Sequence, residues 1–222
     1  MKSVIKMDNT NCLGVRYIAC GDKENEYIIE GTPGNALAAY LDGGNVTVYG
    51  NAQDATGDTM NKGQITIHGS TGDAVGYAMR GGQIFVKNDA GYRAGIHMKQ
   101  YENKLPVLVI GGTVGSFLGE YQAGGIIIVL GIGHEEKSVA GNFCATGMHG
   151  GLIFLRTKNL PKSMPSQVTV TKANEEDMEV VKEYIEKYCD MFGEDIKNIM
   201  ESPFLVIRPN TNNPYKQLYC YS

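Results

Sequence analysis

The chain has 222 residues, of which 29 are glycine, and its formal net charge at pH 7 is −4. This length suits one domain with an appendage, and because the chain has no basic stripe, nucleic-acid binding has no electrostatic support. The first residues, Met1–Asp22, lack the apolar segment of a signal peptide, and no apolar run approaches the roughly 20 residues that a membrane span needs. We therefore expect a cytoplasmic protein whose partners include neither nucleic acid nor a membrane.

The five cysteines are widely spaced and form no C-x-x-C pair, which favours reduced thiols. Two interpretations stay open for Cys12–Cys20. It is either an opening strand or a cap over the open end of the repeats that follow.

Three segments of similar sequence begin at Gly44, Gly63 and Gly82, so the chain repeats every 19 residues. A second pattern, Gly-x-x-x-Gly or Gly-x-x-x-Ala, recurs between them. A fixed period near 20 residues with glycine at set corners indicates a solenoid, and glycine suits a corner because it accepts a positive φ. The glycines that we expect to shape the coils are Gly34, Gly44, Gly57, Gly63, Gly72, Gly76, Gly82, Gly91, Gly95, Gly115, Gly119, Gly125, Gly141 and Gly151.

Seven short strands share this frame, and two of their positions are apolar in every coil. The first position holds Tyr27, Val46, Ile65, Ile84, Leu108, Ile127 and Ile153, and the third holds Ile29, Val48, Ile67, Val86, Ile110, Val129 and Leu155. Side chains two apart share one face of a strand, so both columns are expected to stack into a core. The sequence therefore predicts an all-β solenoid, a parallel β-helix of about seven coils.

Polar residues precede the early strands at equivalent positions, namely Glu26, Asn45, Gln64 and Gln83. They indicate either a ladder of stacked amides or simply solvated corners, and both interpretations stay open.

Two insertions interrupt the period, at Lys99–Leu105 and at Gly131–Ser138. Insertions in a solenoid often mark its binding face, although neutral loop drift costs little and stays an alternative. The candidate partner contacts in these loops are Tyr101, Glu102, His134, Glu135 and Lys137.

The composition changes after Arg156, so we divide the chain into a cap with β-helix repeats, residues 1–156, and a tail, residues 157–222. Leu160–Ser166 is interpreted as a linker or an irregular strap. Asn174 is placed to cap a helix that ends near Gly193, a short second helix is expected over Glu194–Met200, and the prolines favour an extended Pro203–Pro209.

The first tail helix carries one apolar face, made of Met178, Val181, Ile185, Tyr188 and Phe192. The middle strand position is apolar in the later coils, at Phe85, Val109, Ile128 and Phe154. Either the tail covers this outward column or a partner protein does.

The sequence contains no convincing catalytic, cofactor or metal site. His134 and Glu135 lack the second histidine of a zinc helix, and Gly131–Ser138 has Glu136 where a phosphate loop needs glycine before its lysine. Cys144 has His149 nearby in sequence, but we interpret it as a small buried thiol.

Several motifs of the chain resemble the GXGXG domain, the C-terminal domain of the glutamate synthase large subunit. The closest segments are Gly72–Gly82, Tyr121–Gly125 and Asn142–Gly151, and the tail from Glu175 through Phe204–Pro209 to Tyr215-Lys216 follows the same order. The resemblance implies a right-handed β-helix that serves as a non-catalytic scaffold, here as a stand-alone subunit or homologue. It also implies the reaction of glutamine with 2-oxoglutarate to give glutamate.

In that family the amidotransferase centre, the FMN site and the iron–sulfur ligands lie in other domains. We therefore expect no cofactor in this chain, and FMN and an iron–sulfur cluster on partner subunits. Alternatives are a β-helix like the β-helical subunit of formylmethanofuran dehydrogenase, a free-standing binding module, and a homo-oligomer of this chain.

Overall fold

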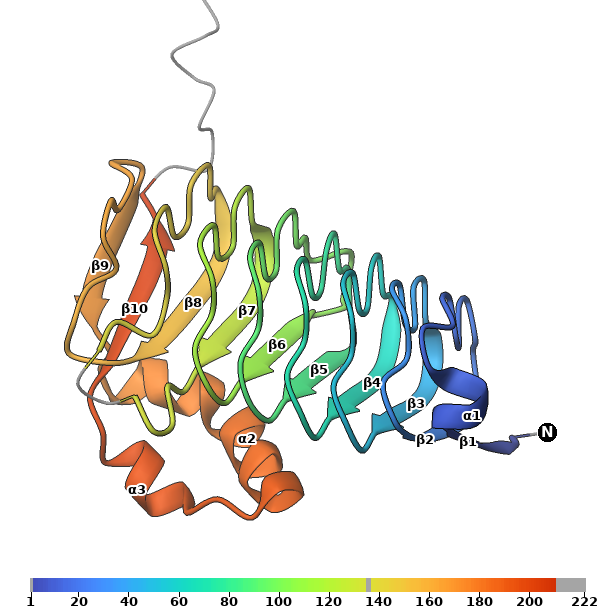
Figure 1. Ribbon diagram of the computed structural model, residues 1–222. Helices are drawn as coiled ribbons and strands as arrows, with labels where there is room; N and C mark the ends of the chain where they lie inside the picture. The colour runs from blue at the N-terminus through green and yellow to red at the C-terminus, as the bar shows by residue number, and fades with distance from the viewer. Residues whose placement is uncertain (1, 135–136, 211–222) are drawn as a thin grey trace, which may run out of the picture.

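One ten-stranded sheet runs the length of the molecule in the computed structural model, which describes residues 2–134 and 137–210 (Figure 1). The parallel strands are β1 (Val4–Asp8), β2 (Glu26–Glu30), β3 (Asp42–Val48), β4 (Lys62–Ile67), β5 (Gln83–Val86), β6 (Val107–Ile110), β7 (Ala123–Val129) and β8 (Gly150–Arg156). The remaining elements are α1 (Asn9–Cys12), β9 (Val168–Lys172), α2 (Glu175–Phe192), α3 (Ile196–Met200) and β10 (Phe204–Pro209).

The register of the parallel strands is the one that the repeat predicts. Tyr27 pairs with Val46, Val46 with Ile65, and the same column continues through Ile84, Leu108 and Ile127 to Ile153. The third column pairs in the same way and, from Ile29 to Leu155, is fully buried. The predicted β-solenoid of about seven coils is confirmed, and its core is one continuous cluster from Cys12 to Ile207.

The chain starts its first coil earlier than Cys12–Cys20. The opening strand is β1, in which Ile5 pairs with Tyr27. Residues 14 and 18–21 form turns instead, with Gly14 and Gly21 at φ +69° and +66°, conformations that an extended strand does not contain.

The polar residues before the early strands do lie in register, since Glu26 pairs with Asn45, Asn45 with Gln64 and Gln64 with Gln83. Gln64 Nε2, however, donates to Thr66 Oγ1 of its own strand at 3.1 Å. The same nitrogen also lies 3.6 Å from the Met191 sulfur of α2. The Gln64 amide nitrogen is therefore used within its own strand and toward α2, and not in a bond to the next coil.

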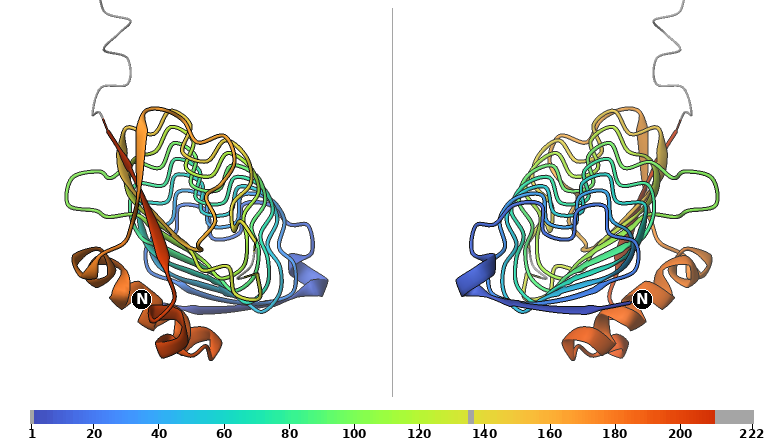
Figure 2. Two further views of the ribbon diagram at one scale, coloured as in Figure 1. Left: turned by 90° about the vertical axis from the view of Figure 1, so that its left-hand side faces the viewer. Right: turned by 90° about the vertical axis from the view of Figure 1, so that its right-hand side faces the viewer.

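The tail covers the outward column of the later coils, which confirms one of the two predicted possibilities. Tyr188 and Ile185 of α2 belong to one buried cluster with Phe85, Val109 and Phe154 of the sheet. Both helices lie against this outer face, outside the coils (Figure 2). The predicted helix caps are also confirmed, because the Asn174 side chain accepts from the backbone N–H of Asp177, and Gly193 is left-handed at φ 75°.

The tail also adds two strands to the sheet, and β9 was not recognised in the sequence. Strand β10 is antiparallel to both of its neighbours, so that Val206 lies between Phe154 of β8 and Thr171 of β9. The last coil of the solenoid is therefore covered by the chain's own tail. Tyr215 and Lys216 lie outside the described residues.

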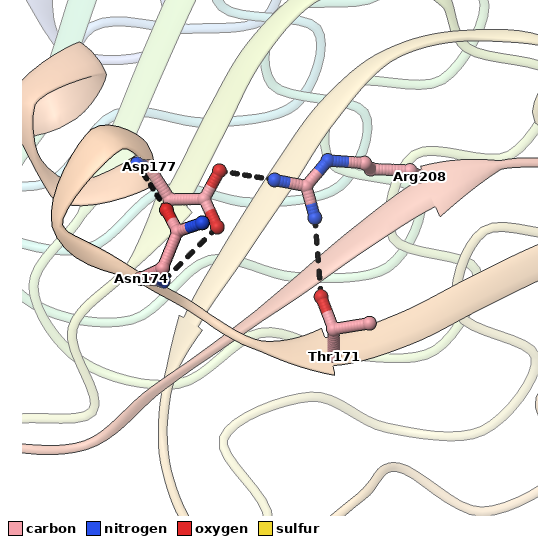
Figure 3. A network of polar contacts seen from close by, with 4 residues as sticks. All are labelled: Thr171, Asn174, Asp177 and Arg208. Atoms are coloured by element: carbon pink, nitrogen blue, oxygen red, sulfur yellow. Dashed lines mark hydrogen bonds and ion pairs between the residues drawn. The ribbon is translucent and has the colours of Figure 1, made fainter.

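A polar network joins α2 to these two strands (Figure 3). Arg208 of β10 pairs with the Asp177 carboxylate and donates to Thr171 Oγ1 of β9 at 3.1 Å. The Asn174 backbone N–H donates in turn to Asp177 Oδ2 at 3.1 Å. One arginine thus fixes the start of the helix to the strands beside it.

Candidate functional site

The first insertion forms a short hairpin before β6. Tyr101 bridges to Lys104, whose backbone N–H donates to Tyr101 O at 3.0 Å. Glu102 is left-handed at φ 54°, and the Tyr101 side chain is 49% exposed. The loop projects from the solenoid wall on the side that carries α2 (Figure 2).

The second insertion follows β7 and is fastened to neighbouring coils. Gly131 N–H donates to Gly112 O at 3.1 Å, and Ile132 N–H donates to Gly111 O at 2.8 Å. Thr157 Oγ1 reaches Lys137 O at 3.3 Å. Glu135, another candidate contact, lies outside the described residues.

The structure does not bring the two insertions together. The hairpin enters the start of β6, whereas the second loop leaves the end of β7, and these two strands are parallel neighbours. The candidates Tyr101 and Glu102 therefore lie at one end of the strands, and His134 and Lys137 at the other. A single small ligand cannot contact both sets, but two partner proteins can each contact one.

A cleft of about 230 Å³ borders the second loop. Lys87, His134, Tyr188 and Glu194 line it, together with Gly111 and Gly112. Side chains of both charge signs face the same small space, so the lining favours neither anions nor cations.

The predicted structural glycines fall into three columns with different physical reasons. The first column has ordinary φ values but lies against the preceding coil, and consists of Gly34, Gly72, Gly91, Gly115 and Gly141. The second is left-handed and consists of Gly57, Gly76, Gly95 and Gly119. The third combines a positive φ with close approach to a backbone oxygen, and consists of Gly44, Gly63, Gly82, Gly125 and Gly151.

Gly151 illustrates the third column. Its φ is +80°, and a Cβ there would come within 2.6 Å of Gly125 O in the coil below. Close coil packing, and not only the corner angle, therefore requires glycine.

Cys144 does not have the environment of a nucleophile. Its thiol is completely buried, and burial raises its pKa to about 12, so it stays protonated at neutral pH. His149 Nδ1 lies 3.1 Å from the carbonyl oxygen of Gly147. The interpretation as a buried structural thiol agrees with this geometry.

The described residues contain no group of three or more histidine, cysteine, aspartate or glutamate side chains placed to hold a metal ion. Among the same residues, no helix is both long and apolar enough to cross a membrane. His68 and His97 are instead stacked on rings, His68 on Tyr49 at 4.5 Å and His97 on Tyr121 at 5.1 Å between centroids.

Two exposed rows of ring contacts were not predicted from the sequence, and we call them the aromatic rows. Their contacts are stacked except that of Tyr77 with His97, which is edge-on at 79°. One row runs from Arg93 over Phe117 to Phe143, and the other from Tyr77 over His97 to Tyr121. The members of each row occupy neighbouring coils. Aligning the two lengthened coils with the regular ones would have placed Phe117 above Arg93, so the signal was present in the sequence.

Comparison with known proteins agrees with this architecture. The family model described as the GXGXG motif matches residues 7–208. An uncharacterised protein of Methanocaldococcus jannaschii is 50% identical over 217 residues, which cover 94% of this chain and 83% of the relative. The match spans the solenoid together with α2, α3 and most of β10, and the chain therefore belongs to the GXGXG motif family, the family of the C-terminal domain of the glutamate synthase large subunit.

Proposed function

We propose that this chain is a non-catalytic scaffold subunit of a split glutamate synthase. In this role it holds an amidotransferase subunit and a flavin-binding subunit in register while glutamine and 2-oxoglutarate are converted to glutamate. The observation that carries the proposal is the family match over residues 7–208, which includes the helical tail as well as the repeats.

The architecture suits a rigid body that keeps two partner subunits at a constant separation. The coils share one continuous core from Cys12 to Ile207, and since coils in a sheet are spaced by about 4.8 Å, seven of them extend over roughly 30 Å. A packed core deforms little. Partners fixed at separate places on such a body keep a constant separation, which the transfer of ammonia from one active site to another requires.

The chemistry of the buried thiols supports placing the reactive groups on the partners. Burial raises the pKa of Cys144 to about 12 and that of Cys189 to about 11, so both are protonated at neutral pH. Thiolates, not thiols, act as nucleophiles and as iron ligands. The proposal therefore assigns FMN, the iron–sulfur cluster and the glutamine-hydrolysing nucleophile to other subunits of a cytoplasmic complex.

The two insertions are the proposed contacts with these subunits. Because they lie at opposite ends of the strands, we assign Tyr101 and Glu102 to one partner contact, and His134 and Lys137 to another. Substituting Tyr101 by alanine is expected to weaken binding of one subunit only.

The decisive experiment is native co-purification from the source cells, followed by reconstitution. Recovery of a flavin-containing subunit and an amidotransferase is expected, and adding this chain to the two should restore glutamine-dependent glutamate formation. Recovery of formylmethanofuran dehydrogenase subunits would favour the alternative family role instead. Recovery of the chain alone, as a monomer or a homo-oligomer, would refute the scaffold role.

A further inference from the structure

The corner segments of the solenoid, residues 36–40, 55–59, 74–78, 93–97, 117–121 and 143–147, share an unusual backbone. In each one the first, third and fifth residues have a positive φ. The third lies on the inner side, and the first and fifth lie at the surface or only half-buried in most coils. Backbone bonds to the next coil fix these angles, for example from Phe117 N–H to Asn142 O at 2.9 Å and from Tyr121 N–H to Thr146 O at 2.8 Å.

The residue types at these left-handed positions change along the solenoid. The corners of the earlier coils carry mainly small residues, namely Ala36, Ala55, Thr59, Ala74 and Ala78. Three consecutive later coils instead carry bulky ones, Arg93, His97, Phe117, Tyr121 and Phe143, with φ between 54° and 65°. Tyr17 and Tyr40 are bulky as well, but they stand apart from this group.

A left-handed backbone is unfavourable for bulky L-residues, so local propensity does not explain this choice. Strained residues persist where the surrounding structure imposes them and where function uses them. Here hydrogen bonds to the next coil impose the angle on the corners from residues 36–40 to residues 117–121, small and bulky alike. The bulky side chains therefore need a reason of their own.

Stacking gives these side chains a fixed arrangement. The Arg93 guanidinium lies 4.7 Å from the Phe117 ring centroid, and the Phe117 and Phe143 rings stack at 5.0 Å. In the second row the Tyr121 and His97 rings are 5.1 Å apart and nearly parallel, at 11°. Rings that are already ordered lose little side-chain entropy when a partner covers them.

The rows remain open to solvent and carry little net charge. Phe143 is 46% and Tyr121 is 36% exposed. The charge of Arg93 is neutralised by Glu120, because Arg93 Nε lies 3.3 Å from Glu120 Oε2. The corner segments lie along the upper edge of the solenoid in Figure 1, whereas α2 and α3 lie below the sheet, so these two helices do not cover the rows.

We propose that the aromatic rows are the docking face for a partner protein whose contacting surface is aliphatic and uncharged. Tyrosine, phenylalanine, histidine and a neutralised arginine suit such a surface, because aromatic and arginine side chains form the energetic centres of protein interfaces and charged groups are depleted there. This inference rests on the proposed function and names the surface by which the scaffold holds one of its subunits.

The test replaces bulky corner residues by glycine, which adopts the left-handed conformation without strain. Phe117→Gly and Tyr121→Gly remove the docking face, and Tyr40→Gly is the matched control, since Tyr40 is 55% exposed at φ 57° but outside the rows. All three variants are expected to fold, with thermal midpoints no lower than that of the wild type. The probes are the flavin-binding and amidotransferase subunits of the same genome, each purified and titrated by calorimetry.

The expected result is a loss of affinity of at least about tenfold for one subunit in the two row variants and no change in the control. Should Phe117→Gly unfold, Tyr121→Asn replaces it, because asparagine also tolerates this backbone. Wild-type affinity in both row variants overturns this inference and leaves the scaffold role intact. If the wild-type chain binds neither subunit, the proposed scaffold function is wrong, and so is the assignment of the docking face to one of these subunits. If the row variants change only self-association in sedimentation, the face joins two copies of the chain and the inference is overturned.

Discussion

The Tyr188 hydroxyl is the point at which helix α2 is fastened to the solenoid, and changing it tests how the tail is held. Tyr188 is fully buried, and its hydroxyl donates to Lys87 O at 2.8 Å. Burial raises the pKa of this phenol above its ordinary value, so it stays a donor at all physiological pH values. Gly111 lies directly beneath, where a Cβ would overlap both the hydroxyl and the Lys87 carbonyl.

Tyr188→Phe keeps the ring and removes only the hydrogen bond. Leaving a buried acceptor without its donor costs about 1–2 kcal/mol. Because 1.4 kcal/mol corresponds to a factor of ten, the population in which α2 is detached should rise roughly tenfold. Amide hydrogen exchange of α2 measures this population directly, and Tyr40→Phe, which removes an exposed hydroxyl, is the control.

A second experiment introduces Gly111→Ala alone and together with Tyr188→Phe. The added methyl group meets the hydroxyl, the ring carbon Cζ and the Lys87 carbonyl in the first background, and in the second it meets the same groups except the hydroxyl. The substitution at Gly111 should therefore cost less once the hydroxyl is gone. Unchanged exchange in α2, or costs that add to within about 0.5 kcal/mol, would refute the reasoning.

Three further predictions concern other parts of the chain. Gly76→Val is expected to lower the free energy of unfolding by at least about 1–2 kcal/mol, because φ is +68° there. Gly76→Ala should lower it less, since Ala38 occupies the equivalent corner at φ 55°. Equal thermal midpoints for the wild type and both variants would count against the corner geometry. Deleting residues 174–222 uncovers the apolar outer column, so light scattering should detect aggregation. Deleting only residues 211–222 is the control. A monodisperse protein after deletion of residues 174–222 would contradict the packing of the tail on the column. Burial, and to a lesser degree a nearby lysine, lower the pKa of His68 from 6.5, so the folded state resists its protonation and stability should fall as the pH drops below 6.5. The urea midpoints at about pH 7.5 and about pH 5.5 should therefore differ less for His68→Phe than for the wild type. Equal differences in the two proteins would exclude His68 as the cause.

The repeat itself could be predicted from the sequence because its information is local. Each coil contacts mainly the coils before and after it, so the 19-residue period fixes the register of the regular coils, as the column from Tyr27 to Ile84 shows. In the two lengthened coils the apolar pattern of the strand itself restores the register, and the column continues to Ile153. The ends of α2 were predictable for a similar reason, since Asn174 and Gly193 act on backbone groups within one helical turn.

The sequence did not reveal which end of the strands each insertion occupies, or that the two loops are separated. That separation follows from the parallel pairing of β6 with β7, which brings only like ends of strands together. Strand β10 was likewise recognised as extended but without its partners, because its pairing with β8 links residues about 50 positions apart and runs against the direction of the repeat.

The amino-acid sequence thus determined the solenoid frame, its core columns and the amphipathic tail, because these depend on side-chain period and on contacts between adjacent coils. The tertiary structure decided where the tail docks, how the last coil is covered and which bulky residues take left-handed corners. Residue propensity opposes those conformations at Phe117 and Tyr121, and the hydrogen bonds of the neighbouring coil impose them. Only after the coils are stacked do these side chains line up as a surface.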